Sequence, residues 1–144
     1  MKRSEFPLWE AVEVRWSDMD AMGHVNNARY FTYLECARIH LFETLELKLL
    51  QGDKHGVALV SVGCNFRKQV RYPAVLEIGT RVSQIGERSF HLEHAFFLQG
   101  EDIVMADAHS VVVCVNYAEE KAVPLPDALR ARLEQLRGVP EESV

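Results

Sequence analysis

Residues 18–47 decide the fold, and they read DMDAMGHVNNARYFTYLECARIHLFETLEL. From Ala28 to about Leu47, apolar residues recur at steps of three or four, which is the spacing of an amphipathic helix. These residues are Tyr30, Leu34, Ala37, Leu41 and Leu45, and the stripe is widened by Phe31 and Phe42. An apolar stripe of this width over roughly five turns predicts a long helix that is wrapped by other structure.

The remaining sequence changes to the two-residue period of strands. A first half-buried strand is expected where Val12, Val14 and Trp16 alternate with polar residues. After the helix come four more alternating stretches, separated by turns that contain glycine or proline: residues 58–66, 74–85, 90–98 and 103–117. A short amphipathic helix is expected around Leu129, Leu133 and Leu136, and the tail at 139–144 is expected to be disordered.

This order of elements predicts an α+β fold. Strands joined by tight turns form an antiparallel sheet, and a twisted sheet with one apolar face curls over the helix that covers it. The expected architecture is the hotdog fold: about five antiparallel strands wrapped around one long central helix, plus a short C-terminal helix. Residues 1–138 would form a single domain, and its uncovered strand edges predict a homodimer or homotetramer.

The composition excludes several other classes of protein. Of 144 residues, 48% are hydrophobic and the formal net charge is −5, which argues against a nucleic-acid surface. No apolar run is long enough to span a membrane, and the N-terminus lacks a secretory signal, so we expect a cytoplasmic protein. Three separated cysteines without a CxxC pair predict free thiols. His91 and His94, three residues apart in a strand, face opposite sides, so no metal site is expected.

The segment from Asp18 to Tyr30 resembles the signature of the hotdog thioesterases, which include the 4-hydroxybenzoyl-CoA thioesterase-like proteins. Its His-Val-Asn-Asn at 24–27 is similar to plant acyl-ACP thioesterases. The spacing to Tyr72-Pro73 and to the turn at 85–89 also resembles this family, so the likeness covers most of the chain. It implies hydrolysis of an acyl-CoA or acyl-carrier-protein thioester, with neither a metal nor another cofactor.

The chemistry of this reaction fits the residues. Thioester hydrolysis needs a base or nucleophile and a donor for the developing oxyanion. Asp20 supplies a carboxylate just before the long helix, and the unpaired amides of the first helical turn supply donors. The resemblance aligns this donor with the backbone N–H of Asn27. Asp20 would either attack the carbonyl to give a mixed anhydride or activate water as a general base, and the sequence leaves both routes open.

Other roles for the same residues remain open. Asp18 and Asp20 could simply cap the turn, and Asp18 would be the catalytic residue only if the loop register differed from that of the family. His24 matches the histidine of the acyl-ACP thioesterases and could bind substrate, water or the carboxylate, or cap the loop. That family usually carries asparagine where this chain has Met22, so its full catalytic network does not transfer.

A Cys-His-Asn set of Cys64, His24 and Asn27 is a lesser alternative, because an apolar strand face raises the pKa of a thiol. The acyl group would run into the apolar space between the long helix and the sheet, bordered by residues such as Tyr30, Phe31 and Leu34.

For the phosphates of CoA, the candidate contacts are Arg67, Arg88 and Ser89, with Lys68 and Arg71 as further cations. Two rival functions remain. One is an enoyl-thioester hydratase or dehydratase that uses Asp20 and His24, and the other is a non-catalytic acyl-CoA-binding module.

Overall fold

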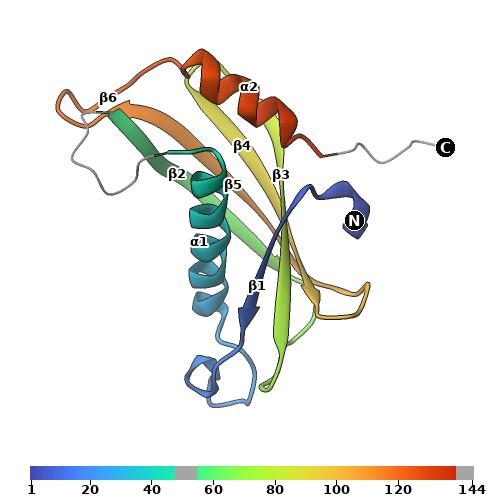
Figure 1. Ribbon diagram of the computed structural model, residues 1–144. Helices are drawn as coiled ribbons and strands as arrows, with labels where there is room; N and C mark the ends of the chain where they lie inside the picture. Colours follow the sequence, from blue (N-terminus) through green and yellow to red (C-terminus); the bar gives the residue numbers. More distant parts are fainter. Residues whose placement is uncertain (48–54, 139–144) are drawn as a thin grey trace.

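The computed structural model describes residues 1–47 and 55–138 (Figure 1). The tail expected to be disordered, 139–144, lies outside this range. The elements are η1 (Arg3–Glu5), β1 (Leu8–Glu13), η2 (Trp16–Asp18), α1 (Asn27–Thr44), β2 (His55–Phe66), β3 (Val75–Ile85), β4 (Ser89–Leu98), β5 (Val104–Asn116), β6 (Lys121–Ala122) and α2 (Asp127–Gln135). In Figure 1, α1 crosses the hollow face of the curled sheet, and α2 lies at the far end of that sheet from the start of α1.

The sheet is antiparallel, and its strand order is β1-β3-β4-β5-β2, with β6 paired to β5. The predicted hotdog fold, with one long helix and a short C-terminal helix, is confirmed. The first residue of β1, Leu8, pairs with Thr80 of β3. Beyond this pair, the outer edge of β3 is covered by the segment after α2, where the Val82 amide donates a 2.9 Å hydrogen bond to the Leu136 carbonyl. The two outermost strands of the sheet are β1 and β2.

The core between α1 and the sheet has two apolar clusters. The first surrounds Tyr30, Leu34 and Phe96 near the start of α1, and the second surrounds Leu41 and Phe90 near its end and includes the buried leucines of α2. The alternation along the strands accounts for both clusters, because every second side chain faces the helix. The predicted core face of α1 is therefore confirmed, except that Phe31, expected to widen the apolar stripe, is 38% exposed.

The prediction for the first strand is wrong in its position. Strand β1 covers Leu8–Glu13, and Trp16, expected to lie in the strand and face the core, is 75% exposed in the short helix η2. The chain leaves the sheet here because Asp18 is drawn into the interior, where it accepts a 3.0 Å hydrogen bond from the amide of Arg15. A buried carboxylate that captures backbone amides overrides the alternating pattern.

Helix α1 also ends earlier than predicted, at Thr44 rather than near Leu47. Glu46 has a φ of 59°, which lies in the left-handed region, and the amide of Leu47 donates a 2.9 Å hydrogen bond to the Phe42 carbonyl. A left-handed residue followed by such a backward bond terminates helices.

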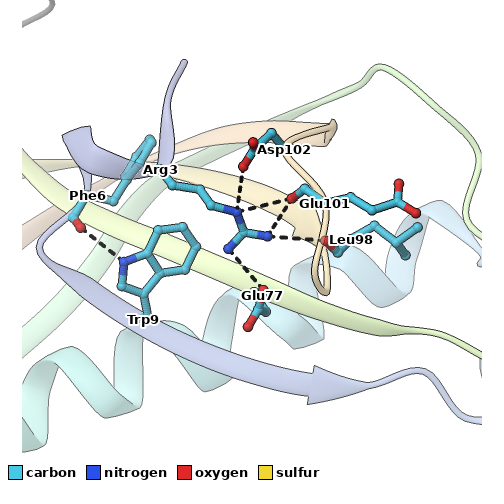
Figure 2. Close-up of polar contacts among 7 residues, drawn as sticks. All are labelled: Arg3, Phe6, Trp9, Glu77, Leu98, Glu101 and Asp102. Atoms are coloured by element: carbon cyan, nitrogen blue, oxygen red, sulfur yellow. Dashed lines mark hydrogen bonds and ion pairs between the residues drawn. The ribbon is translucent and has the colours of Figure 1, made fainter.

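The outer face of the sheet is partly covered by the N-terminal segment, which Arg3 fastens in place (Figure 2). The guanidinium of Arg3 pairs with Glu77 at 2.9 Å and donates to the carbonyls of Glu101 at 2.6 Å and Leu98 at 3.2 Å. Its centre lies 4.7 Å from the ring centroid of Phe97. This arginine therefore joins the N-terminal segment to β3 and to the hairpin between β4 and β5.

Candidate active site

Asp20 lies in a tight loop between η2 and α1. Its Oδ1 accepts hydrogen bonds from the amides of Met22, at 2.8 Å, and His24, at 3.2 Å. The main chain closes the same turn, because the amide of Asp20 donates to the His24 carbonyl at 2.8 Å, and Gly23 takes the positive φ of 79° that the turn requires. The capping role considered for Asp20 is thus real, but it uses only Oδ1. For Oδ2, no donor is found among the residues that the structure describes.

Asp18 has a different role from Asp20. Its side chain is fully buried, and Oδ2 accepts a 2.6 Å hydrogen bond from the hydroxyl of Tyr33 as well as the Arg15 amide bond. Burial alone would raise the pKa of Asp18, but the hydrogen bonds from Tyr33 and Arg15 outweigh it and hold the pKa below its ordinary value. Asp18 is an anchor of the loop, and its carboxylate is occupied by these contacts.

At the start of α1, one backbone amide has no acceptor among the described residues. Asn26 caps the helix, since its side-chain oxygen accepts a 2.9 Å hydrogen bond from the amide of Ala28. The amide of Asn26 donates to the Asp18 carbonyl, and that of Arg29 donates to the Asn26 carbonyl. In the described ranges 1–47 and 55–138, no acceptor is found for the N–H of Asn27, the donor that the family resemblance implied.

A cavity of about 490 Å³ joins these groups. It is lined by Asp20, Met22, His24, Val25, Asn27, Tyr30, Phe66, Arg67, Lys68 and Gln69. The three predicted catalytic residues, Asp20, His24 and Asn27, therefore border one space at the positive end of the α1 dipole. His24 Nε2 is fully buried and has no hydrogen-bond partner in the part of the chain that the structure describes.

Of the three predicted CoA contacts, only Arg67 lines this cavity. Its guanidinium is held by the largely buried carboxylate of Asp107, which also accepts a 3.0 Å hydrogen bond from Asn65. The structure does not bring Arg88 and Ser89 to the site within one chain. Arg88 lies in the turn between β3 and β4, and Ser89 begins β4. This turn is at the opposite end of the sheet from the start of α1 (Figure 1), and the eleven residues of β3 alone extend over about 30 Å.

The cysteine alternative is disfavoured by the surroundings of Cys64. Burial, with a smaller contribution from the charge of Asp107, raises the pKa of its thiol to about 11, so the thiolate is scarce at neutral pH. Within the described residues, no group of three or more His, Cys, Asp or Glu side chains could hold a metal ion.

A second cavity of about 490 Å³ lies at the opposite end of α1, between Leu45, Val57 and Leu129. It is mainly apolar. Its carboxylate, Glu46, is paired with Arg132 at 2.6 Å. The cavity at the start of α1 is the better candidate, because of these two it alone is lined by Asp20 and Asn27, whose carboxylate Oδ2 and helix N–H, respectively, lack partners in the described part of the chain.

Comparison with known proteins identifies the family. The family model of the thioesterase-like superfamily matches residues 14–133. The long-chain acyl-CoA thioesterase FadM of Escherichia coli is 31% identical over 126 residues, which cover 87% of this chain and 96% of FadM. The PA2801 protein of Pseudomonas aeruginosa, described as a putative thioesterase, is 37% identical with a TM-score of 0.79, over 85% of this chain and 95% of that chain.

The PA5185 protein of the same organism has a TM-score of 0.88 and 29% identity, covering 97% of this chain and 98% of that one. The chain belongs to the thioesterase-like superfamily, and it is a thioester hydrolase of the hotdog fold. Among the described helices, none has the length and apolar character needed to cross a membrane.

Proposed function

We propose that this enzyme hydrolyses acyl-CoA with Asp20 as its catalytic carboxylate and the backbone N–H of Asn27 as its oxyanion donor. The observation that carries this proposal is the shared cavity. Asp20 and Asn27 line the same space, and in the described structure neither Asp20 Oδ2 nor the Asn27 N–H has a hydrogen-bond partner. This is the pair of groups that thioester hydrolysis requires.

The reaction follows from this arrangement. The thioester carbonyl oxygen accepts a hydrogen bond from Asn27 N–H, and the field of the α1 dipole stabilises the charge that develops on it. Oδ2 of Asp20 then either attacks the carbonyl carbon to form a mixed anhydride, which water later opens, or removes a proton from the attacking water. In both routes the carbon–sulfur bond breaks, CoA leaves as the thiolate, and the acyl group leaves as the acid.

His24 supports the same chemistry. Its main chain closes the Asp20 turn, and its buried Nε2 has no partner among the described residues, although buried polar atoms are normally hydrogen-bonded. A water molecule or the substrate would satisfy Nε2. We therefore assign to His24 the binding of the attacking water or of the thioester beside Asp20.

The proposed substrate class rests on the positive charges at the cavity and on the similarity to FadM. Arg67 and Lys68 place cations on the wall of the cavity, where the phosphates of CoA would leave it. The relative FadM is named a long-chain acyl-CoA thioesterase, and we extend the acyl-CoA class to this chain. An acyl carrier protein, whose thioester has the same reactive group, is the alternative donor of the acyl chain.

A second copy of the chain would complete the site. Strand β2 is outermost in the sheet and carries the exposed apolar residues Leu59 and Val60. Antiparallel pairing of two β2 strands about a twofold axis would bring the far end of one sheet to the cavity of the other copy. Arg88 and Ser89 would reach the CoA phosphates only from such a partner. A mass of one chain in solution would contradict this dimer.

Release of free thiol separates this proposal from its rivals. A series of acyl-CoA substrates, mixed with the protein and a thiol reagent, should give CoA and free acid catalytically. A hydratase would instead consume the double bond of an enoyl-CoA without releasing thiol. A binding module would show saturable acyl-CoA binding without turnover, and that result would overturn the proposal.

A further inference from the structure

Arg38 occupies a core position of α1. It lies one turn after the buried Leu34 and directly follows Ala37, which is 1% exposed. The side chain of Arg38 is itself buried, with 8% of its surface exposed. It separates the two apolar clusters at the place where the sequence period would favour an apolar residue.

The partners of Arg38 are neutral. Its Nη1 donates to Ser110 Oγ at 3.5 Å, Ser110 Oγ lies 3.1 Å from His94 Nε2, and His94 Nδ1 lies 3.0 Å from Thr80 Oγ1. This chain of side chains crosses the sheet from β5 to β3. No Asp or Glu of residues 1–47 and 55–138 lies within ion-pair distance of Arg38.

The other donors of the guanidinium remain open. Nε and Nη2 of Arg38 have no hydrogen-bond partner among the described side chains and carbonyls. They are not fully enclosed, because His24 Nε2 is the only fully buried, unpartnered side-chain nitrogen or oxygen among the described residues that are not exposed. A buried cation is costly unless an anion compensates it. The planar fork of N–H groups on arginine fits a carboxylate with two parallel hydrogen bonds.

The position of Arg38 relative to the cavity can be estimated along two elements. Along α1, the eleven residues from Asn27 to Arg38 correspond to about 16 Å at the helical rise. Along β5, the four residues from Ala106 to Ser110 correspond to about 13 Å. Ala106 pairs with Phe66 at the cavity, and Ser110 pairs with Val62. Between these two pairs, the alternate residues of β5 on this face are small: Ala106, Ala108 and Ser110.

We propose that Arg38 binds a carboxylate at the distal end of the acyl group, so that the enzyme prefers the mono-CoA thioesters of α,ω-dicarboxylic acids. This inference rests on the proposed function, because it places the thioester at Asn27 and Asp20. The acyl chain would then lie along α1 on the side of β2, where Val62 and Cys64 are partly exposed. Its terminal carboxylate would take the two open donors of Arg38.

The test compares two substrates of equal length, dodecanedioyl-CoA and lauroyl-CoA, by thiol release. Wild-type protein should favour dodecanedioyl-CoA in kcat/KM by at least about tenfold, as expected for a charge-assisted, paired contact. Arg38→Met, which keeps a long apolar side chain, should lose this preference and hydrolyse lauroyl-CoA at least as well as wild type. Arg38→Lys, which keeps the charge but loses the fork, should retain part of it.

Several outcomes would overturn the inference. A wild-type preference for lauroyl-CoA would do so without any variant, and an equal loss on both substrates in a folded Arg38→Met protein would make Arg38 structural. Arg38→Met could instead change the oligomeric mass in solution and leave the substrate preference unchanged. In that case the carboxylate that binds Arg38 belongs to a second copy of the chain, and the inference is wrong. If the protein hydrolyses lauroyl-CoA but not dodecanedioyl-CoA, this inference is wrong and the proposed function stands. If no acyl-CoA releases thiol, both the inference and the proposed function are wrong.

Discussion

The hydroxyl of Tyr33 donates a 2.6 Å hydrogen bond to Oδ2 of Asp18, and this contact ties the loop that carries Asp20 to the middle of α1. Asp18 is fully buried, so its carboxylate depends on such donors. The two acidic residues of the loop, Asp18 and Asp20, thus have different roles. Asp18 fixes the loop in place, and Asp20, which lines the cavity, has one carboxylate oxygen without a partner among the described residues.

Loss of this bond should lower stability. Tyr33→Phe leaves a buried carboxylate with one donor fewer, and we expect its free energy of unfolding to fall by about 1–3 kcal/mol in urea titrations. Tyr30→Phe is the matched control, because Tyr30 is equally buried on the same helix but its hydroxyl has no hydrogen bond to the described residues. Equal stability of both variants would contradict the anchoring role of Asp18.

The buried His94 should make stability depend on pH. Burial, together with the charges of Arg38 and His109, lowers its pKa to about 3, against an ordinary value of 6.5. Between these two values the unfolded chain binds a proton that the folded chain does not. The free energy of unfolding should therefore fall as the pH drops below 6.5, by up to about 1.4 kcal/mol per pH unit.

Unfolding titrations at several pH values check this dependence on His94. His94→Gln keeps polar atoms near Thr80 and Ser110 but does not titrate, so its stability should vary less between pH 6.5 and 4.5 than that of wild type. Parallel curves for the two proteins would show that other groups dominate.

The Arg3 contacts should contribute to stability but not to catalysis. Arg3→Ala removes the ion pair with Glu77 and the hydrogen bonds to the hairpin between β4 and β5, and we expect a loss of about 1–3 kcal/mol with kcat unchanged. Lys2→Ala, one residue earlier and exposed, is the control and should be neutral. Thermal unfolding beside an activity assay measures both properties, and a stable but inactive Arg3→Ala protein would show that the outer face affects the site.

Local sequence patterns predicted the fold well where period and burial agree. The stripe from Tyr30 to Leu45 located α1, and the alternation after Gly56 located four strands. The pattern failed at Trp16, because the tertiary contacts of a buried carboxylate decided the backbone there. The alternating residues alone gave no sign of those contacts.

The candidate site was predicted from the loop and helix start, since Asp20, His24 and Asn27 are close in sequence and remain close in space. The CoA contacts were harder to predict, because they depend on how the strands are arranged. Arg67, which directly follows β2, lines the cavity, whereas Arg88 and Ser89 lie at the other end of the sheet. Arg38 was missed altogether. A charged residue at a core position of the helix stripe was the available signal.

The role of Asp20 is tested most directly by the turnover of Asp20→Asn. Asparagine keeps a side-chain oxygen that can accept the amide bonds of Met22 and His24, so the loop should stay closed while the nucleophile or base is lost. We predict that kcat for acyl-CoA hydrolysis falls at least about a hundredfold, with the free energy of unfolding within about 1 kcal/mol of wild type. Near-normal thiol release by the folded variant would contradict the assignment of Asp20.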